Sequence, residues 1–386
     1  MSARPAILFY CQHSLGMGHL VRSLALADSL VRRFRVVLLN GGRMPKGIVV
    51  PAGIEVVDLP PLGMNDAGAL VSLDKRLSVE RALDRRQRII RESFAKLRPA
   101  VVLVELFPFG RKKFAGELLP LLHAARRPET RALVVCSLRD ILVSQRKKQQ
   151  EHDDRAATWA NELFDLVLVH SDPSFARFED SFQPRIPLRV PVEYTGFVVP
   201  RTSVLRREPS LRKTIIVSAG GGFVGEPLLR LAIEAQRHLA NDAEIEMKII
   251  GGPLVPRESW QLLRSLARGR KHLKLVKHVS DLAGELSGAA VSISQAGYNT
   301  CLDVLRAGVP ALLVPFAREN ENEQRTRALR LQDLGLVKVL DESEQTSERL
   351  ANEIRGLLNF KFATPALDLN GAERSAELIE SMLCTG

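Results

Sequence analysis

Short runs of aliphatic and β-branched residues alternate with longer segments of helical periodicity along most of the chain. This alternation predicts parallel sheets with helices on both faces. The strands expected in the first half are Ala6–Tyr10, Arg35–Leu39, Ile54–Asp58, Val101–Glu105, Ala132–Ser137 and Leu166–His170. The helices expected between them are Leu20–Arg33, Lys75–Leu97, Lys113–Arg126 and His152–Leu163.

The alternation stops near residue 200 and resumes near residue 214. Residues 201–213 are rich in basic residues and lack apolar periodicity, so we place a linker there. The strands expected after it are Thr214–Ser218, Ile245–Ile250, Leu273–Val276, Ala290–Ser294, Ala311–Val314 and Leu336–Val339. The expected helices are Glu226–His238, Arg257–Ala267, Asp281–Ser287, Tyr298–Arg306, Asn320–Gln332, Ser343–Leu358 and Gly371–Cys384.

The pattern predicts an α/β protein with two Rossmann-like domains. Residues 1–200 form the N-terminal domain and residues 214–365 the C-terminal domain, and residues 366–386 hold a terminal helix that packs back on the N-terminal domain. Ligands of such sheets bind at the carboxyl ends of the strands. We therefore expect the two parallel sheets to face a central cleft.

Basic charge is concentrated in the first half. The chain of 386 residues has a net charge of +11, and its first 200 residues hold 30 of the 55 Lys and Arg but 21 of the 44 Asp and Glu. Such a surface suits nucleic acid, an anionic membrane or an acidic substrate. Only 5% of the residues are aromatic and no helix-turn-helix signal is present, which argues against nucleic acid.

Cysteine usage and apolar runs indicate the compartment. Cys11, Cys136, Cys301 and Cys384 show no CxxC spacing, so neither a disulfide scaffold nor a zinc site is expected. The longest apolar stretch, near residues 307–317, is about half of a membrane span. We expect a cytoplasmic protein that docks peripherally on the inner membrane face.

A glycine-containing loop follows the first strand. Gly16 and Gly18 flank a helix start and precede His19. The positive end of a helix disfavours imidazolium, so His19 would stay neutral and suit a general base. The alternative is that His19 only caps the helix. No acidic residue ends the second strand, which argues against NAD binding.

A second glycine loop, Ser218-Ala-Gly220-Gly221-Gly222, follows the first strand of the second half. Backbone N–H groups of successive glycines at a helix start can cradle a diphosphate. The alternative is a tight strand-to-helix turn, which needs only one glycine.

The segment of residues 292–328 carries a third motif. Gln295 and Gly297 follow a strand, Asn299, Thr300 and Asp303 lie on the next helix, and Glu323 and Gln324 lie in or after a polar loop. Together with the two glycine loops, this order resembles the MurG-like glycosyltransferases of family 28 over nearly the whole chain. Taken whole, the chain looks like a MurG-like group of predicted glycosyltransferases. The segment GMGHLVRSLALADSL is also similar to nucleotide-sugar hydrolases on the same scaffold.

The resemblance implies a GT-B fold and a role for each motif residue. Asp303 would accept hydrogen bonds from the ribose, and Glu323 and Gln324 would bind hydroxyls of the donor sugar. Gly220–Gly222 would face the diphosphate, and the helix after Gly297 would point at it. His278 and Val279 would read the base. Asp303 taken alone would be only a solvated helix residue.

Three further residues lie near the first loop. Glu105 either orients His19 or acts as the base itself; the alternative is that it pairs with Arg111 or Lys112. Arg22 either meets an anionic group or faces solvent, and Arg139 lies on the acceptor side. The basic runs 111–113 and 146–148 are either solvated surface or membrane-facing.

The function expected from these residues is sugar transfer without a cofactor. No DxD pair is present to hold a metal between phosphates, and the resemblance also implies metal independence. A hexose would move with inversion from a nucleoside diphosphate donor, with uridine as the expected base, to the hydroxyl of a lipid-linked or anionic acceptor of the cell envelope. The alternatives are a nucleotide-sugar hydrolase and a non-catalytic nucleotide-sugar-binding protein. The carboxylate arrangement of the related 2-epimerases is not found.

Overall fold

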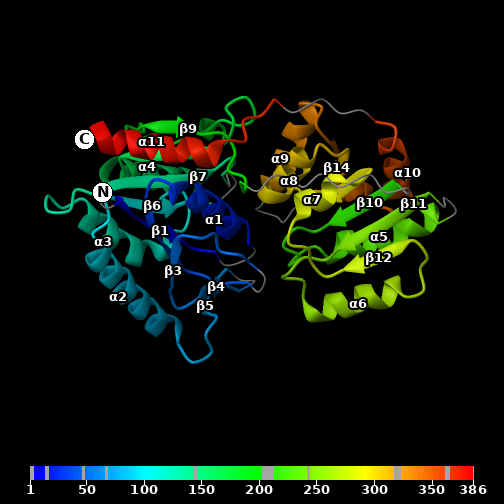
Figure 1. Cartoon of the computed structure of the whole chain (residues 1–386), viewed down its shortest axis with the longest axis horizontal. Coiled ribbons are helices and arrows are strands. Elements are labelled where there is room, and N and C mark those ends of the chain that lie inside the picture. Colours follow the sequence, from blue (N-terminus) through cyan, green and yellow to red (C-terminus); the bar gives the residue numbers. More distant parts are fainter. Residues whose placement is uncertain are drawn as a thin grey trace. The chain divides into compact units, whose positions relative to one another are not determined.

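The computed structural model describes residues 4–13, 17–45, 48–65, 68–142, 147–201, 213–240, 244–316, 323–360 and 366–385. The chain forms two compact units (Figure 1). Unit 1 comprises Met1–Met44, Ile48–Arg201 and Leu367–Gly386, and unit 2 comprises Thr202–Ala366 with Pro45–Gly47. Most of the predicted linker, residues 202–212, and Gly16 lie outside the described residues.

Unit 1 contains a seven-stranded parallel sheet in the order β3-β2-β1-β6-β7-β8-β9. The strands are β1 (Ala6–Cys11), β2 (Arg35–Asn40), β3 (Ile54–Asp58), β6 (Val101–Glu105), β7 (Leu133–Arg139), β8 (Leu166–His170) and β9 (Val192–Tyr194). A separate antiparallel hairpin pairs β4 (Leu62–Met64) with β5 (Leu70–Ser72). The strand order reverses between β1 and β6, which is where doubly wound sheets bind ligands.

Alternate residues of β1 face two different helix layers. Leu8 and Tyr10 pack with α2 (Val79–Leu97), α3 (Ala115–Ala125) and α4 (Gln149–Leu163). Ile7 and Phe9 pack with α1 (Gly18–Leu30) and α11 (Gly371–Thr385). Burial on both faces explains why the strands are continuously apolar.

The last helix, α11, belongs to unit 1 although it follows unit 2 in the chain. It lies along α1 (Figure 1) and buries Ala372, Ala376 and Ile379 in the same core. Arg33, just after α1, donates to Glu373 at 2.6 Å and to Glu380 at 3.0 Å. Apolar packing and these ion pairs together hold the end of the chain on the first sheet.

Unit 2 contains a six-stranded parallel sheet in the order β12-β11-β10-β13-β14-β15. The strands are β10 (Lys213–Ser218), β11 (Ile245–Ile250), β12 (Leu273–Val276), β13 (Val291–Ser294), β14 (Ala311–Leu313) and β15 (Lys338–Val339). The helices are α5 (Glu226–Leu239), α6 (Arg257–Ala267), α7 (Leu282–Ser287), α8 (Tyr298–Ala307), α9 (Glu323–Asp333) and α10 (Ser347–Leu357). The order reverses between β10 and β13. Short 3₁₀ turns lie at Lys112–Phe114, Phe178–Asp180 and Glu342–Glu344.

The predicted α/β architecture with two parallel sheets is confirmed, and most of the differences are at element ends. Helix α2 begins at Val79 rather than Lys75, because the Ser78 hydroxyl accepts from the Arg81 amide and caps it. The hairpin β4–β5 and strand β9 were not predicted, since three residues are too short to show a period.

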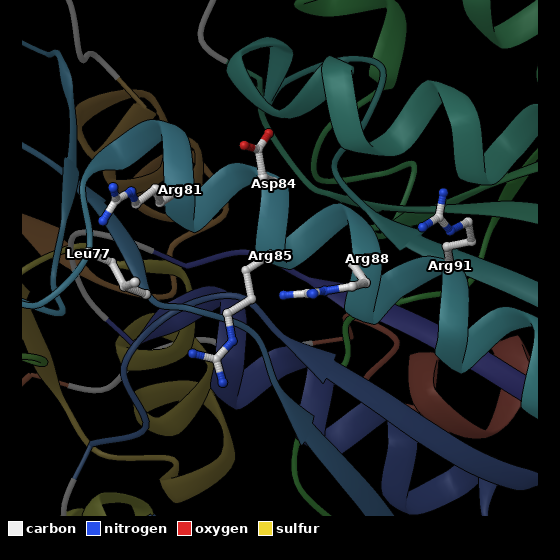
Figure 2. Close-up of a pocket in the computed structure, with 6 residues that line it drawn as sticks. All are labelled: Leu77, Arg81, Asp84, Arg85, Arg88 and Arg91. Atoms are coloured by element: carbon white, nitrogen blue, oxygen red, sulfur yellow. The ribbon is translucent and has the colours of Figure 1, made fainter.

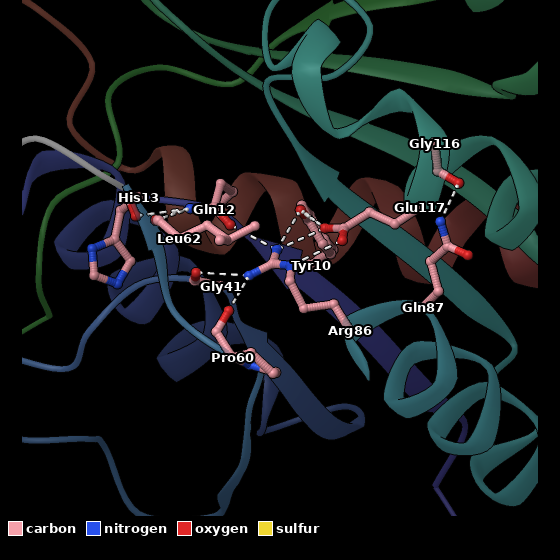
Figure 3. A network of polar contacts seen from close by, with 10 residues as sticks. All are labelled: Tyr10, Gln12, His13, Gly41, Pro60, Leu62, Arg86, Gln87, Gly116 and Glu117. Carbon is pink, nitrogen blue, oxygen red and sulfur yellow. Dashed lines mark hydrogen bonds and ion pairs between the residues drawn. The ribbon is translucent and has the colours of Figure 1, made fainter. Parts of the chain in front are cut away.

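A fully buried arginine ties the loops after β1, β2 and β3 to helices α2 and α3 (Figure 3). Arg86 donates to both carboxylate oxygens of Glu117, at 2.8 and 2.6 Å. It also donates to Gln12 Oε1 at 2.7 Å and to the carbonyls of Gly41 and Pro60 at 2.9 and 3.0 Å. Since the ion pair is completely buried, its stability depends on these further bonds.

We predict that Arg86→Gln destabilises unit 1 by about 3–5 kcal/mol, because it leaves the Glu117 carboxylate buried without its counter-charge. Urea unfolding followed by circular dichroism measures the loss. The matched control is Arg76→Gln, which removes an exposed partner of Asp74 and is expected to change little. Equal effects of the two substitutions would contradict the prediction.

Candidate active site

Three side chains meet at the carboxyl end of β6, beside the end of β1. His19 lies in the first turn of α1, Arg22 one turn later, and Glu105 is the last residue of β6. The Nδ1 of His19 lies 2.6 Å from Glu105 Oε1, and Arg22 Nη2 donates to the same oxygen. Glu105 is completely buried, whereas His19 keeps 22% of its side chain exposed. The site therefore presents the imidazole outward and keeps the carboxylate behind it.

The charges around His19 decide its protonation. The pKa of His19 is lowered to about 4, because burial together with Arg111 and Arg22 outweighs the opposing effect of Glu105. Burial alone would raise the pKa of Glu105, but His19, Arg22 and Arg111 bring it well below its usual range. A carboxylate only accepts hydrogen bonds, so His19 donates through Nδ1. Its Nε2 is then a free acceptor for a substrate proton.

Arg111 completes this cluster and is not solvated surface. Its Nε lies 3.8 Å from Glu105 Oε2, and only 10% of its side chain is exposed. Lys112 and Lys113, the other members of this basic run, are exposed. Glu105 therefore also contacts Arg111, as one of the predicted alternatives held. This contact is longer than those of Glu105 with His19 and Arg22.

A second polar layer, absent from the sequence prediction, lies deeper at the same sheet edge. His170 ends β8 and bonds Ser137 Oγ at 2.8 Å through Nε2 and Thr195 Oγ1 at 2.9 Å through Nδ1. The pKa of His170 is lowered to about 3, mainly by burial and also by Arg22, while Glu105 opposes the change. Arg139 ends β7 in register with His170. The signal for this layer was polar residues at the ends of apolar strands.

In unit 2 the glycine loops after β10 and β11 pack directly on each other. A Cβ at Gly222 would collide with the Gly251 carbonyl, and one at Gly252 with the carbonyls of Gly220 and Gly221. Gly220, Gly222 and Gly252 also have positive φ angles of 58°, 87° and 96°. More than one glycine is therefore required for the turn itself. The sequence prediction included Gly220, Gly221 and Gly222 but missed the second loop.

The start of α8 lies against the first of these loops. Gly297 is the helix N-cap, and Thr300 is buried with its hydroxyl directed at Gly220. Ser218 Oγ accepts from the Gly220 amide at 3.2 Å. Gln295 is buried, and its backbone N–H donates to the Ser218 carbonyl at 3.2 Å. The switch point of the second sheet therefore gathers these predicted residues.

Asp303 lies one turn further along α8. The pKa of its carboxyl group is raised to about 7: burial is the main cause and Asp281 adds to it, whereas Arg306, whose Nη1 is 3.7 Å from Asp303 Oδ1, opposes the rise. The carboxylate is thus partly deprived of solvent and can accept from hydroxyl donors that bind beside it. Asn299, half-buried, lies on the same helix.

The remaining predicted residues lie on neighbouring loops of unit 2. Gln324 Oε1, on the first turn of α9 beside Glu323, accepts from the Phe316 amide at 3.2 Å just after β14. His278 is exposed and Val279 half-buried after β12, where the carbonyl of Lys277 accepts from Gly252. Within the described residues, no hydrogen bond or ion pair joins His278 to the glycine loops.

Arg327 is a positioning residue that the sequence prediction missed. It is buried on α9, donates to the Ala296 carbonyl at 2.9 Å, and lies 5.8 Å over the Tyr298 ring. It thereby joins α9, with Glu323 and Gln324, to the turn before α8. A buried arginine on an otherwise polar helix carries little sequence signal.

The described residues hold neither a metal-binding cluster nor a membrane-spanning helix. These residues include no three His, Cys, Asp or Glu side chains placed to hold a metal ion. Within the same ranges, no helix combines the length and apolar character needed to cross a membrane.

Comparison with known proteins agrees with this geometry. Residues 215–380 match the glycosyltransferase family 28 C-terminal domain. The UDP-N-acetylglucosamine–N-acetylmuramyl-(pentapeptide) pyrophosphoryl-undecaprenol N-acetylglucosamine transferase of Yersinia enterocolitica is 22% identical over 337 residues, 87% of this chain and 85% of that protein.

Solved structures show the same fold. The calicheamicin glycosyltransferase CalG4 has a TM-score of 0.62 at 18% identity and covers 100% of this chain and 95% of its own. MurG of Acinetobacter baumannii has a TM-score of 0.59 at 18% identity, with 98% and 100% covered. The expected GT-B fold and MurG-like resemblance are confirmed. Residues 215–380 are therefore a glycosyltransferase family 28 C-terminal domain, and the chain is a glycosyltransferase with the GT-B fold that is similar to the MurG-type transferases over most of its length.

Proposed function

We propose that the protein is an inverting, metal-independent glycosyltransferase that moves a hexose from a UDP-sugar to an acceptor hydroxyl. The observation that carries the proposal is the contact between His19 and the buried Glu105 carboxylate. It fixes the tautomer that leaves Nε2 of His19 able to take a proton. The word UDP in the Yersinia relative's name supports uridine as the base.

His19 acts as the general base in this mechanism. Its Nε2 takes the proton of the acceptor hydroxyl while that oxygen attacks the anomeric carbon. The bond from this carbon to the diphosphate breaks, and the nucleoside diphosphate leaves from the opposite face. Glu105 is completely buried and bonds Nδ1, so it orients His19 and stabilises the imidazolium that forms, instead of acting as the base.

Unit 2 binds the donor. Asp303 accepts from the ribose hydroxyls, and Glu323 and Gln324 contact the sugar. The loop Gly220–Gly222 and the N-terminus of α8 face the diphosphate with backbone N–H groups. Helix dipoles and amides then stabilise the departing charge without a metal.

A hydrolase on the same scaffold is the second candidate, favoured by the sequence similarity around His19. Water would then replace the acceptor and take the same position at Nε2. A non-catalytic nucleotide-sugar-binding protein is the third, and it would need neither the exposed imidazole nor the buried carboxylate behind it.

One test of this proposal concerns His19 as the general base. We expect His19→Ala to lower turnover about 10²–10⁴-fold, because general-base assistance is lost. The affinity for UDP, measured by calorimetry, is expected to stay unchanged. Glu105→Gln is expected to lower turnover in the same direction, since the imidazolium loses its counter-charge.

The control is His123→Ala on the exposed face of α3, with unchanged turnover expected. Full turnover in His19→Ala would refute the mechanism. Product analysis separates the candidates: free sugar formed at an undiminished rate without acceptor indicates the hydrolase, and no turnover under any condition the binding protein.

The second prediction concerns pH. With the pKa of Asp303 near 7 in the free protein, hydroxyl donors favour its ionised form, so ligand binding lowers that pKa. UDP affinity should therefore fall up to tenfold for each pH unit below about 7. Calorimetry from about pH 5 to about pH 9 measures this.

Asp303→Asn should bind UDP more weakly and without this pH dependence. The exposed Asp333→Asn on α9 is the control and should retain both affinity and slope. A wild-type affinity that does not change across this range would refute the role of Asp303. His19 contributes no step near pH 7, because its pKa is about 4.

We further propose that unit 1 docks on anionic lipid through one face of α2. This docking presents a lipid-linked acceptor to the site around His19. Arg81, Arg85, Arg88 and Arg91 line a shallow surface pocket with Leu77 and Asp84 (Figure 2). All four arginines are exposed, and none is ion-paired with another described residue. Four unpaired cations on one helix face suit a phosphate-bearing surface.

The third prediction follows from this face. Replacing the four arginines by Gln should weaken binding to phosphatidylglycerol vesicles about a thousandfold, at about 1 kcal/mol per residue. Co-sedimentation against neutral phosphatidylcholine vesicles gives the baseline. The control removes Arg257, Arg264, Arg268 and Lys271 at α6, which carry the same charge. Equal weakening by both sets, or no preference for anionic lipid, would contradict the docking face.

A further inference from the structure

Arg111 combines a left-handed backbone with a nearly buried side chain, whereas Arg98 and Arg131, which also have a positive φ, are exposed. It follows Gly110 in the loop after β6 and has a φ of 59°, in the left-handed region that non-glycine residues rarely occupy. The loop is anchored by Phe109, which packs edge-on against Phe178 and Phe182 at 5.1 and 5.0 Å. This anchored loop turns the Arg111 side chain inward, where only 10% of it remains exposed.

Two nitrogens of Arg111 lack a hydrogen-bond partner among the described residues, as does the nearest acceptor, Glu105 Oε2. Its Nε and Nη2 are buried and make no hydrogen bond with the described part of the protein. Its contact with Glu105 is 3.8 Å, whereas Arg22 makes a short hydrogen bond to the other carboxylate oxygen. A buried guanidinium normally has partners for its N–H groups. The N–H donors on Nε and Nη2 of Arg111 therefore have no acceptor among the described residues.

Two cations lie within 4 Å of the one carboxylate of the cluster. Glu105 carries one negative charge, and Arg22 and Arg111 carry two positive charges. His19 and His13 are neutral near pH 7, because burial and Arg111 both lower their pKa values. The charged residues with the largest effects on His19 are Glu105, Arg111 and Arg22. Arg111 and Arg22 thus share the single negative charge of Glu105.

We infer that Arg111 binds an anionic oxygen group, a phosphate or carboxylate, of the acceptor substrate next to the hydroxyl that His19 deprotonates. The planar guanidinium offers paired N–H donors that fit either group. The inference rests on the proposed function and adds the chemical class of the acceptor: it carries a negative charge close to the attacking hydroxyl. Arg111 is then a specificity-determining residue of unit 1.

The test uses the full chain with inorganic phosphate as the probe and His19 as the reporter. Histidine ring NMR, assigned with His19→Gln, gives the pKa of His19 in sodium phosphate and in sodium chloride of equal ionic strength. An anion held by Arg111 should raise that pKa from about 4 toward about 6. The rise should be lost in Arg111→Gln and partly kept in Arg111→Lys.

Arg127→Gln, an exposed arginine after α3, is the matched control and should show the wild-type response. Thermal melting supplies a second readout: phosphate should raise the melting temperature of wild type more than that of Arg111→Gln. Because unit 2 is unchanged, the difference isolates Arg111. If phosphate moves neither the His19 pKa nor the difference in melting, Arg111 only balances Glu105 and the inference is overturned.

A binding measurement with UDP shows whether the anion on Arg111 belongs to the acceptor or to the sugar donor. UDP should bind wild type and Arg111→Gln equally well, and Asp303→Asn weakly. Loss of UDP affinity in Arg111→Gln would assign the anion to the donor and overturn the acceptor assignment. Failure of wild type to bind UDP would reject the proposed function, yet a phosphate response that depends on Arg111 would still show the anion site.

Discussion

The carboxylate of Glu105, buried at the end of a central strand, is the constraint on which the catalytic side of unit 1 depends. A charge without solvent must be matched by nearby cations and hydrogen-bond donors. Three chain segments supply them: His19 and Arg22 from the first turns of α1, and Arg111 from the loop after β6. The same requirement explains why the guanidinium groups of Arg22 and Arg111 are buried beside this carboxylate.

A second buried charge pair holds the opposite face of β1. Tyr10 points to that face, where its hydroxyl bonds Glu117 and Arg86 binds both. Arg86 also bonds Gln12, whose amide donates to the carbonyl of His13 at the edge of the active-site cluster. Strand β1 thus lies between two polar clusters. The hydrogen bonds of Arg86 on one face of β1 thus help to hold Gln12 and His13, beside the cluster on the other face.

Periodicity predicts most of this fold because both sheets are parallel and buried on two faces. The pairing of His19 with Glu105 could also be foreseen, since β1 and β6 are neighbours and their carboxyl ends meet. The inward turn of Arg111 could not, because it depends on a positive φ and on two aromatic anchors, Phe178 and Phe182, far away in the chain. Nor could the shielding of Asp303, which arises from how α8 packs beside α7. Basic runs look alike in sequence whether they are solvated or buried.

The charge of Arg111 also bears on how His19 would work as the proposed base. A histidine with a pKa near 4 is a weak base, and Arg111 and Arg22 contribute to that value. An acceptor anion on Arg111 would cancel one of these charges and strengthen His19 when the correct substrate arrives. Binding and base activation would then be one event. A neutral alcohol or water would meet only the weak base, which discriminates against hydrolysis of the donor.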